Sequence, residues 1–259
     1  MFRIIRPLQG LAGVMRPAER RLAILFQPVR RFGKMLNSSQ TWIAHSGLGL
    51  GLPRISQPKR GMVNRPLRLK KMPTDYPLLT GSEHWRRKAR MVFQRMDANA
   101  DGYLTKEDYV STAQTLIDHL SLTGEKAERI LKGRLELWAA IAGDKTRLSA
   151  EEHWRNNLAL LNGVFFRQEM YRTLICTEFS TMDIDGDGFI SKDEHAAYYY
   201  SLDIPTECSK DDFDIMDTNG DGLVSIDEFA ESFLGFWLTE DSNNIYNQNF
   251  GHLVIDQCD

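Results

Sequence analysis

Two stretches in the last third of the chain place oxygen-bearing side chains at a spacing that suits a hard cation. In each, positions 1, 3 and 5 are acidic or amide residues and position 12 is Glu. Calcium takes six to eight oxygen ligands. This spacing supplies three side chains, a backbone carbonyl at position 7, often a water at position 9, and a bidentate carboxylate at position 12. Gly at position 6 permits the sharp turn around the ion. The pattern predicts calcium loops at residues 183–194 and 217–228.

Both stretches, here called loop 3 and loop 4, match the EF-hand calcium loop at every ligand position. One acidic run alone is more often a solvated surface, but two complete matches flanked by helical patterns favour metal binding. The predicted ligands of loop 3 are Asp183, Asp185, Asp187, the backbone carbonyl of Phe189, and Glu194. Those of loop 4 are Asp217, Asn219, Asp221, the backbone carbonyl of Leu223, and Glu228.

An upstream stretch, loop 1 (residues 97–108), carries the same pattern with one difference. Asp97, Asn99 and Asp101 fill positions 1, 3 and 5, and Tyr103 offers its carbonyl at position 7. Position 12 is Asp108, whose side chain is a methylene shorter than Glu and reaches an ion less easily with both oxygens. This favours smaller, six-coordinate Mg²⁺ or weaker Ca²⁺ binding. We therefore expect three ion sites, with Mg²⁺ tolerated at loop 1.

EF-hands occur in pairs, so loop 1 needs a partner. A helical pattern over residues 125–141 and a capping box at Ser149 and Glu152 indicate a further hand with loop 2 at residues 141–152. Its positions 1, 3 and 5 are Ile141, Gly143 and Lys145, so only Glu152 survives from the ligand set and a cation takes the place of the ion. Loop 2 is predicted to be structural and metal-free.

Position 8 links the loops of a pair. The residues there are Leu104, Leu148, Ile190 and Val224. In paired hands these side chains meet in a short antiparallel strand contact. The sequence therefore predicts an all-α fold of four helix–loop–helix units in two pairs, with an N-terminal pair over residues 81–164 and a C-terminal pair over residues 165–236.

Charge separates a basic leader from this acidic body. Residues 1–74 contain fifteen Lys and Arg and one acidic residue, whereas residues 75–259 contain seventeen Lys and Arg and 34 acidic residues. An Arg-rich, nearly acid-free segment is typical of a mitochondrial presequence, and we expect residues 1–40 to be one. The alternative is a disordered basic arm that docks on an anionic membrane surface or on nucleic acid. We expect no nucleic-acid partner, and a cytoplasmic location if the leader is not a presequence.

Residues 41–80 continue basic and contain scattered Gly and Pro, which predicts a linker with little packing. Residues 237–259 are expected to form a tail that packs on the body. No apolar run is long enough for a transmembrane segment, and we expect a monomer. Three widely spaced cysteines, Cys176, Cys208 and Cys258, predict free thiols in a reducing, intracellular compartment.

Sequence signals of catalysis are missing. The chain has no His-Glu-x-x-His motif, no Gly-x-Ser-x-Gly motif and no phosphate-binding Gly-rich loop that opens a helix. We therefore predict no catalytic residues and no cofactor other than Ca²⁺ and Mg²⁺, so the protein is not expected to be an enzyme.

Four hands with a degenerate second loop resemble the sarcoplasmic calcium-binding protein group, which includes calexcitin-like proteins, luciferin-binding proteins and calcium-activated photoproteins. The stretch from Phe233 through Trp237 to Tyr246 is similar to the photoprotein and luciferin-binding branch. That resemblance implies a C-terminal tail that closes a hydrophobic cavity between the two halves. Photoproteins have a His four residues before the Trp, where this chain has Phe233, and His252 does not match. No light emission is expected.

The sequence thus favours an intracellular calcium buffer and signal modulator. A calcium-gated carrier of an apolar small molecule is the first alternative. The second is a sensor that opens to grip target helices, but such sensors use Met-rich grooves. Here three of the five methionines in the hands, Met96, Met182 and Met216, precede the loops as expected core residues.

The shorter carboxylate at position 12 of loop 1 generates a test. Replacing Asp108 with Glu is expected to strengthen Ca²⁺ binding at loop 1, because the longer side chain reaches the ion with both oxygens. Calorimetric titration with Ca²⁺ and with Mg²⁺ measures the change. An unchanged or weaker calcium isotherm for Asp108→Glu would contradict the argument from side-chain length.

Overall fold

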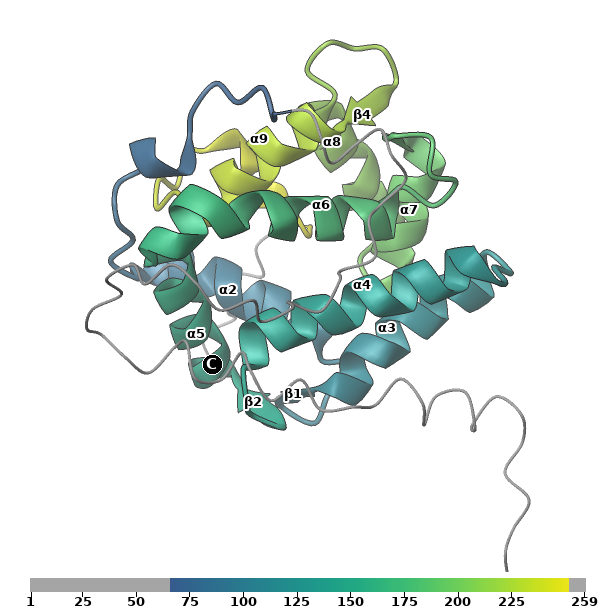
Figure 1. Cartoon of the computed structure of the whole chain (residues 1–259), viewed down its shortest axis with the longest axis horizontal. Coiled ribbons are helices and arrows are strands. Elements are labelled where there is room, and N and C mark those ends of the chain that lie inside the picture. The colour runs from purple at the N-terminus through teal and green to yellow at the C-terminus, as the bar shows by residue number, and fades with distance from the viewer. Residues whose placement is uncertain (1–65, 252–259) are drawn as a thin grey trace, which may run out of the picture. The chain divides into compact units, whose positions relative to one another are not determined.

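The computed structural model describes residues 66–251, and Figure 1 shows these elements in one bundle. Its helices are α2 (Glu83–Met96), α3 (Lys106–His119), α4 (Glu125–Ala142), α5 (Ala150–Asn162), α6 (Tyr171–Met182), α7 (Lys192–Ser201), α8 (Thr206–Met216) and α9 (Ile226–Trp237). Short helical turns are η1 (Pro73–Asp75), η2 (Phe166–Met170) and η3 (Ile245–Gln248). The strands are β1 (Tyr103–Thr105), β2 (Arg147–Ser149), β3 (Phe189–Ser191) and β4 (Leu223–Ser225). The expected all-α class with EF-hand pairs is confirmed.

The loops pair through their eighth positions, as predicted. Strand β1 is antiparallel to β2, with Leu104 opposite Leu148, and β3 is antiparallel to β4, with Ile190 opposite Val224. All four side chains are fully buried. The register confirms the alignment that places Glu152 at position 12 of loop 2.

Every helix that leaves a loop begins with the same capping device. The residue at position 9 is the N-cap, and the carboxylate at position 12 accepts from its backbone N–H and its hydroxyl. The capping pairs are Thr105 and Asp108, Ser149 and Glu152, Ser191 and Glu194, and Ser225 and Glu228. One carboxylate therefore starts the helix while also facing the loop.

A single large core runs through both pairs. Helix α6 contacts α4 on one side and α9 on the other, and Figure 1 shows it crossing the bundle between them. Trp85, Phe179, Phe213 and Phe236 are almost fully buried in this core. Because each such aromatic side chain removes a large apolar area from water, their burial contributes strongly to the stability of this core.

Residues 66–80 correct one expectation. They were expected to belong to a linker with little packing, but the Arg167 guanidinium donates to the backbone carbonyls of Pro73 at 3.0 Å, Tyr76 at 2.6 Å and Pro77 at 3.0 Å. The side chain of Leu79 is buried. A Pro-containing segment has carbonyls that no helix satisfies, and one buried Arg with several donors satisfies three of them. Residues 41–65 and the expected presequence at residues 1–40 lie outside the described part of the chain.

The described part of the tail packs on the body. Lys88 of α2 is fully buried, and its ammonium donates to two carbonyls at the end of α9, that of Phe236 in the last turn at 2.5 Å and that of Thr239 just beyond the helix at 3.0 Å. The indole N–H of Trp85 donates to the carbonyl of Trp237 at 2.9 Å. Helix α2 therefore holds the end of α9, where a cation also suits the helix dipole.

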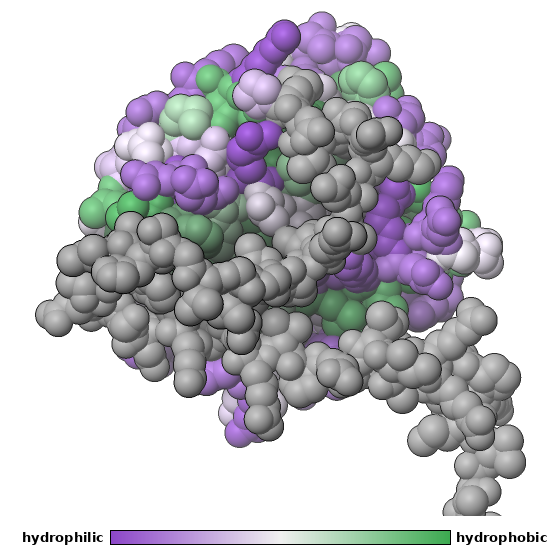
Figure 2. Space-filling model, in the orientation of Figure 1, coloured by the Kyte–Doolittle hydropathy of each residue, from purple (hydrophilic) through white to green (hydrophobic). Residues whose placement is uncertain are grey.

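The surface seen in Figure 2 is mostly hydrophilic, with small separate hydrophobic areas among the described residues. Between residues 66 and 251, none of the helices combines the length and the hydropathy that a membrane span requires. Cys176 and Cys208 are free thiols, as expected, and Cys258 lies outside the described residues.

Candidate calcium sites and the adjoining cavity

Loop 3 brings its predicted side-chain ligands together. Carboxylate oxygens of Asp183, Asp185 and Asp187 lie within 4.8 Å of one another. The two oxygens of Asp183 accept from the N–H groups of Gly186 at 2.7 Å and Gly188 at 3.2 Å, so backbone donors hold them inside the turn. Convergent, hard oxygen donors fit calcium.

Loops 1 and 4 repeat this internal bonding. In loop 4, Asp217 accepts from Gly222 N–H at 2.9 Å, and in loop 1, Asp97 accepts from Gly102 N–H at 2.9 Å. The glycines at position 6 have φ of +82° in loop 1, +99° in loop 3 and +84° in loop 4. Only a residue without Cβ takes such a conformation easily, which explains glycine at this position.

Position 12 distinguishes loop 1 from loops 3 and 4. In loop 3, Glu194 reaches across to accept from the N–H groups of Ile184 at 2.8 Å and Asp185 at 3.1 Å. In loop 4, Glu228 accepts from Thr218 N–H at 3.1 Å. Within the described residues, the hydrogen bonds of the Asp108 carboxylate are confined to Thr105, its own helix cap. The difference in reach that the sequence suggested is therefore visible in the hydrogen bonding.

Loop 2 carries an ion pair where an ion would bind. The ammonium of Lys145 lies 2.5 Å from Glu152, the one carboxylate left at a ligand position. The lysine, together with Ser149, lowers the pKa of Glu152 to about 2. Gly143 has a φ of +61° at position 3, whereas the other loops have their positive φ at positions 4 and 6. Loop 2 thus has neither the ligands nor the backbone of the other loops.

The acidic cluster of loop 3 includes one carboxylate, Asp183, whose ionised form is disfavoured mainly by burial. Burial, and to a smaller extent the neighbouring Glu194 carboxylate, raise the pKa of Asp183 above its ordinary value. A bound divalent cation relieves such a cluster by neutralising it.

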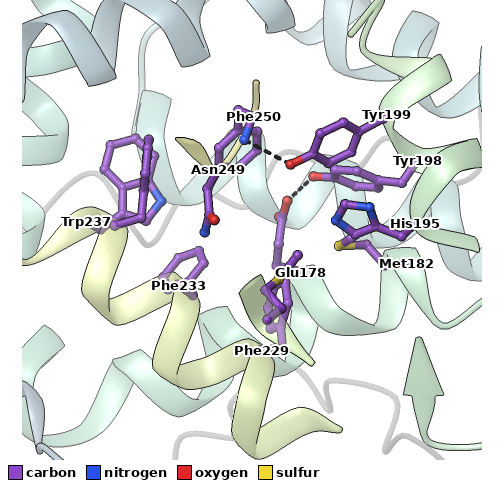
Figure 3. Close-up of a pocket in the computed structure, with 12 residues that line it drawn as sticks. Glu178, Met182, His195, Tyr198, Tyr199, Phe229, Phe233, Trp237, Asn249 and Phe250 are labelled. Atoms are coloured by element: carbon purple, nitrogen blue, oxygen red, sulfur yellow. Dashed lines mark hydrogen bonds between the residues drawn. The ribbon is translucent and has the colours of Figure 1, made fainter. Parts of the chain in front are cut away.

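A small cavity lies beside the C-terminal pair (Figure 3). It has a volume of about 30 Å³ for the centres of water-sized molecules. Its lining comes from α6, α7, α8 and α9 together with Asn249 and Phe250 of the tail. The resemblance implied a cavity between the two halves, but the lining of this one comes only from the C-terminal pair and the tail. The tail does help to close it.

The cavity wall combines aromatic rings with buried polar groups. Figure 3 shows Phe229, Phe233 and Trp237 on α9 facing His195, Tyr198 and Tyr199 on α7. The Tyr198 hydroxyl donates to Glu178 and the Phe250 N–H donates to the Tyr199 hydroxyl. Arg134 of α4 lies 3.8 Å from Glu178 and 3.3 Å from the Tyr198 hydroxyl. Charge pairing and hydrogen bonding offset part of the cost of burying this group, and Arg134 Nε and Nη2 remain buried without a hydrogen-bond partner.

His195 adds to this wall a ring with one hydrogen-bonded nitrogen and one buried nitrogen that has no partner. Its Nδ1 lies 2.7 Å from the Ser209 hydroxyl, while Nε2 is buried without a hydrogen-bond partner. Burial lowers the pKa of His195 to about 3, so the ring is neutral at pH 7. The sequence did not single out Glu178 or His195 for a role. The available signal was an acid beside Phe179 and a His beside Glu194, both at helix positions that face the core.

Comparisons with known proteins agree with this geometry. Residues 172–234 match the EF-hand domain pair, and residues 90–111 match the EF hand. No curated protein matches the chain. The chain is 26% identical to the coelenterazine-binding protein from Renilla muelleri in its calcium-loaded apo form, with a TM-score of 0.57 over 66% of this chain and 99% of that one.

Two further solved structures share the fold. Okadaic acid binding protein 2.1 is 21% identical, with a TM-score of 0.53 over 67% of this chain and 98% of that one. A Streptomyces coelicolor calcium-binding protein is 20% identical, with a TM-score of 0.51 over 60% of this chain and 98% of that one. With the loop geometry, the family matches show that the chain carries EF-hand calcium-binding motifs.

The buried His153 predicts an acid-sensitive fold. Burial lowers its pKa to about 4, from an ordinary value of 6.5 that also applies to the unfolded chain. Because the unfolded state then binds more protons below pH 6.5, the stability is complete above that pH and is lost as the pH falls towards 4. Urea unfolding in the presence of a chelator measures the free energy of unfolding at each pH. In His153→Met, its decrease between pH 6.5 and pH 4 should be smaller than in the wild type by up to roughly 3 kcal/mol. The matched control is His119→Met, because His119 is exposed. If the free energy of unfolding depends on pH equally in the wild type and in His153→Met, the acid sensitivity does not come from His153.

Proposed function

We propose that the protein is a calcium buffer and signal modulator that binds ions at loops 1, 3 and 4, with Mg²⁺ exchange at loop 1. The observation that carries this proposal is the convergence of the predicted ligands in loop 3, together with the same internal bonding in loops 1 and 4. We also propose that residues 1–40 direct it to mitochondria, which rests on their composition.

The interior supports buffering over ligand transport. Pockets that hold drug-sized ligands have volumes of about 300–1,000 Å³, whereas this cavity has about 30 Å³. An organic ligand would have to displace aromatic side chains from the wall. Ion binding needs no such repacking.

Methionine burial argues against the sensor alternative. Met91, Met96, Met182 and Met216 are buried in the core, and Met170 is partly buried against it. A groove that grips target helices needs such side chains at its surface.

Ion stoichiometry tests the proposal directly. Calorimetry of the wild-type chain should give three ions, and Glu194→Gln and Glu228→Gln should each remove one high-affinity site, because the bidentate anchor loses its charge. Glu152→Gln is the matched control, since it makes the same change at position 12 of loop 2 and should leave the stoichiometry unchanged. One ion, or four, in the wild type would overturn the proposal.

We propose transport of an apolar small molecule as a second candidate. The supporting observations are the aromatic wall with the unpartnered Nε2 of His195, and the likeness to a coelenterazine-binding protein. A carrier of this kind binds its ligand in one ion state and releases it in the other. Ion binding at loops 3 and 4 would regulate the cavity, because α7 leaves loop 3, α9 leaves loop 4, and both helices line the cavity.

Coelenterazine is the probe for this candidate. Titration followed by tryptophan fluorescence should show binding in chelator and affinity about tenfold weaker in Ca²⁺, as ordinary coupling energies allow. Phe233→Trp should weaken binding by filling the cavity, and the exposed Phe165→Trp should not. Equal affinity in both ion states, or no binding in either, would exclude a calcium-gated carrier of this ligand.

A further inference from the structure

Loop 3 differs from loops 1 and 4 in its surroundings. Asp183 at position 1 is 2% exposed and Ile184 at position 2 is 6% exposed. The residues at position 2 of the other ion loops, Ala98 and Thr218, are exposed. The first turn of loop 3 is therefore covered by other parts of the protein.

The cover is provided partly by Arg129 on α4, a helix of the N-terminal pair. One guanidinium nitrogen of Arg129 donates to the carbonyls of Asp183 and Ile184, both at 2.8 Å. Another guanidinium nitrogen approaches Gly186 so closely that a Cβ there would lie 2.9 Å from it. The guanidinium thus touches the backbone of the loop at positions 1, 2 and 4, outside the ligand side chains.

A small second core completes the contact. It joins Ala113, Leu116 and Ile117 of α3, Ile130 of α4, Ile184 of loop 3 and Ala197 of α7. Helix α3 leaves loop 1, so this cluster links the exit from the first ion loop to the start of the third. Close-packed groups of this kind change together rather than separately.

We propose that Arg129 is a positioning residue that couples ion binding at loop 3 to the stability of the N-terminal pair. An ion draws the Asp183 and Asp185 carboxylates inward and fixes the first turn of the loop. That turn is the part to which Arg129 and Ile184 attach α4 and α3. Fixing it therefore holds these helices more firmly, and by linkage the N-terminal pair supports ion binding in return. This inference rests on the proposed ion at loop 3.

The charge of Arg129 gives a competing explanation. A cation near the loop could act on the ion by Coulomb repulsion alone, without carrying any coupling. Two variants separate these effects. Arg129→Lys keeps the charge but loses the rigid planar set of donors. Lys126→Met removes one positive charge from the exposed side of the same helix.

Hydrogen exchange of the full chain with and without Ca²⁺ tests the coupling. In the wild type, Ca²⁺ should slow exchange in residues 113–131 by about tenfold, the range of ordinary coupling energies. The ratio of the exchange rate without Ca²⁺ to the rate with Ca²⁺ should fall to about threefold or less in Arg129→Met. It should be intermediate in Arg129→Lys and stay at the wild-type value in Lys126→Met. A merely structural role of Arg129 would change both rates equally and leave their ratio unchanged.

Glu194→Gln distinguishes failure of the inference from failure of the site. It should remove one ion and reduce the calcium effect on residues 113–131 to the part that the ion at loop 1 supplies. A variant that keeps all three ions would overturn the proposed site at loop 3. If Glu194→Gln loses one ion as expected, two results would overturn the coupling and leave the site standing. One is a wild-type ratio of exchange rates in Arg129→Met, and the other is the absence of any calcium effect on residues 113–131 in the wild type. An equal fall in Lys126→Met would assign the effect to charge.

Discussion

The carboxylate at position 12 has two partners in loops 3 and 4, and much of the structure depends on this double contact. One oxygen of Glu194 caps α7 through Ser191, and the other closes loop 3 against its own second and third residues. The loop and the helix that leaves it are therefore tied by a single side chain. Since α7 and α9 line the cavity, a change at this carboxylate reaches the interior through the helices themselves.

Loop 2 keeps the helix-capping half of this contact although its other ligand positions are lost. Glu152 still caps α5 through Ser149, while Lys145 supplies the positive charge that faces its second oxygen. The hand keeps its β-pairing with loop 1, because Leu148 remains buried opposite Leu104. The Lys145 ammonium thus faces the remaining carboxylate of a hand whose other ligand positions lack oxygen-bearing side chains.

Loops 3 and 4 of the C-terminal pair contact different parts of the chain. The large core and the polar group of Arg134, Glu178 and Tyr198 connect α4 with α6 and α7, and Arg129 adds a contact to loop 3. Loop 4 instead meets the segment at residues 66–72, where Arg68 N–H donates to Asp227 at 3.1 Å. Each ion loop of the C-terminal pair therefore has a different neighbour, and their ion binding need not have the same consequences.

The sequence by itself determined what depends on local spacing. The predicted ligand positions, the capping pairs, the degenerate loop and the residue that each loop brings to the β-contact follow from residues within twelve positions of one another, because a short loop fixes its own geometry. Long-range packing decided the rest. Arg167 and the carbonyls of Pro73 and Tyr76, Lys88 and the end of α9, and Arg129 and loop 3 are separated by tens of residues or more. No local pattern records them, because each arises only when buried backbone carbonyls must find a donor in the folded core.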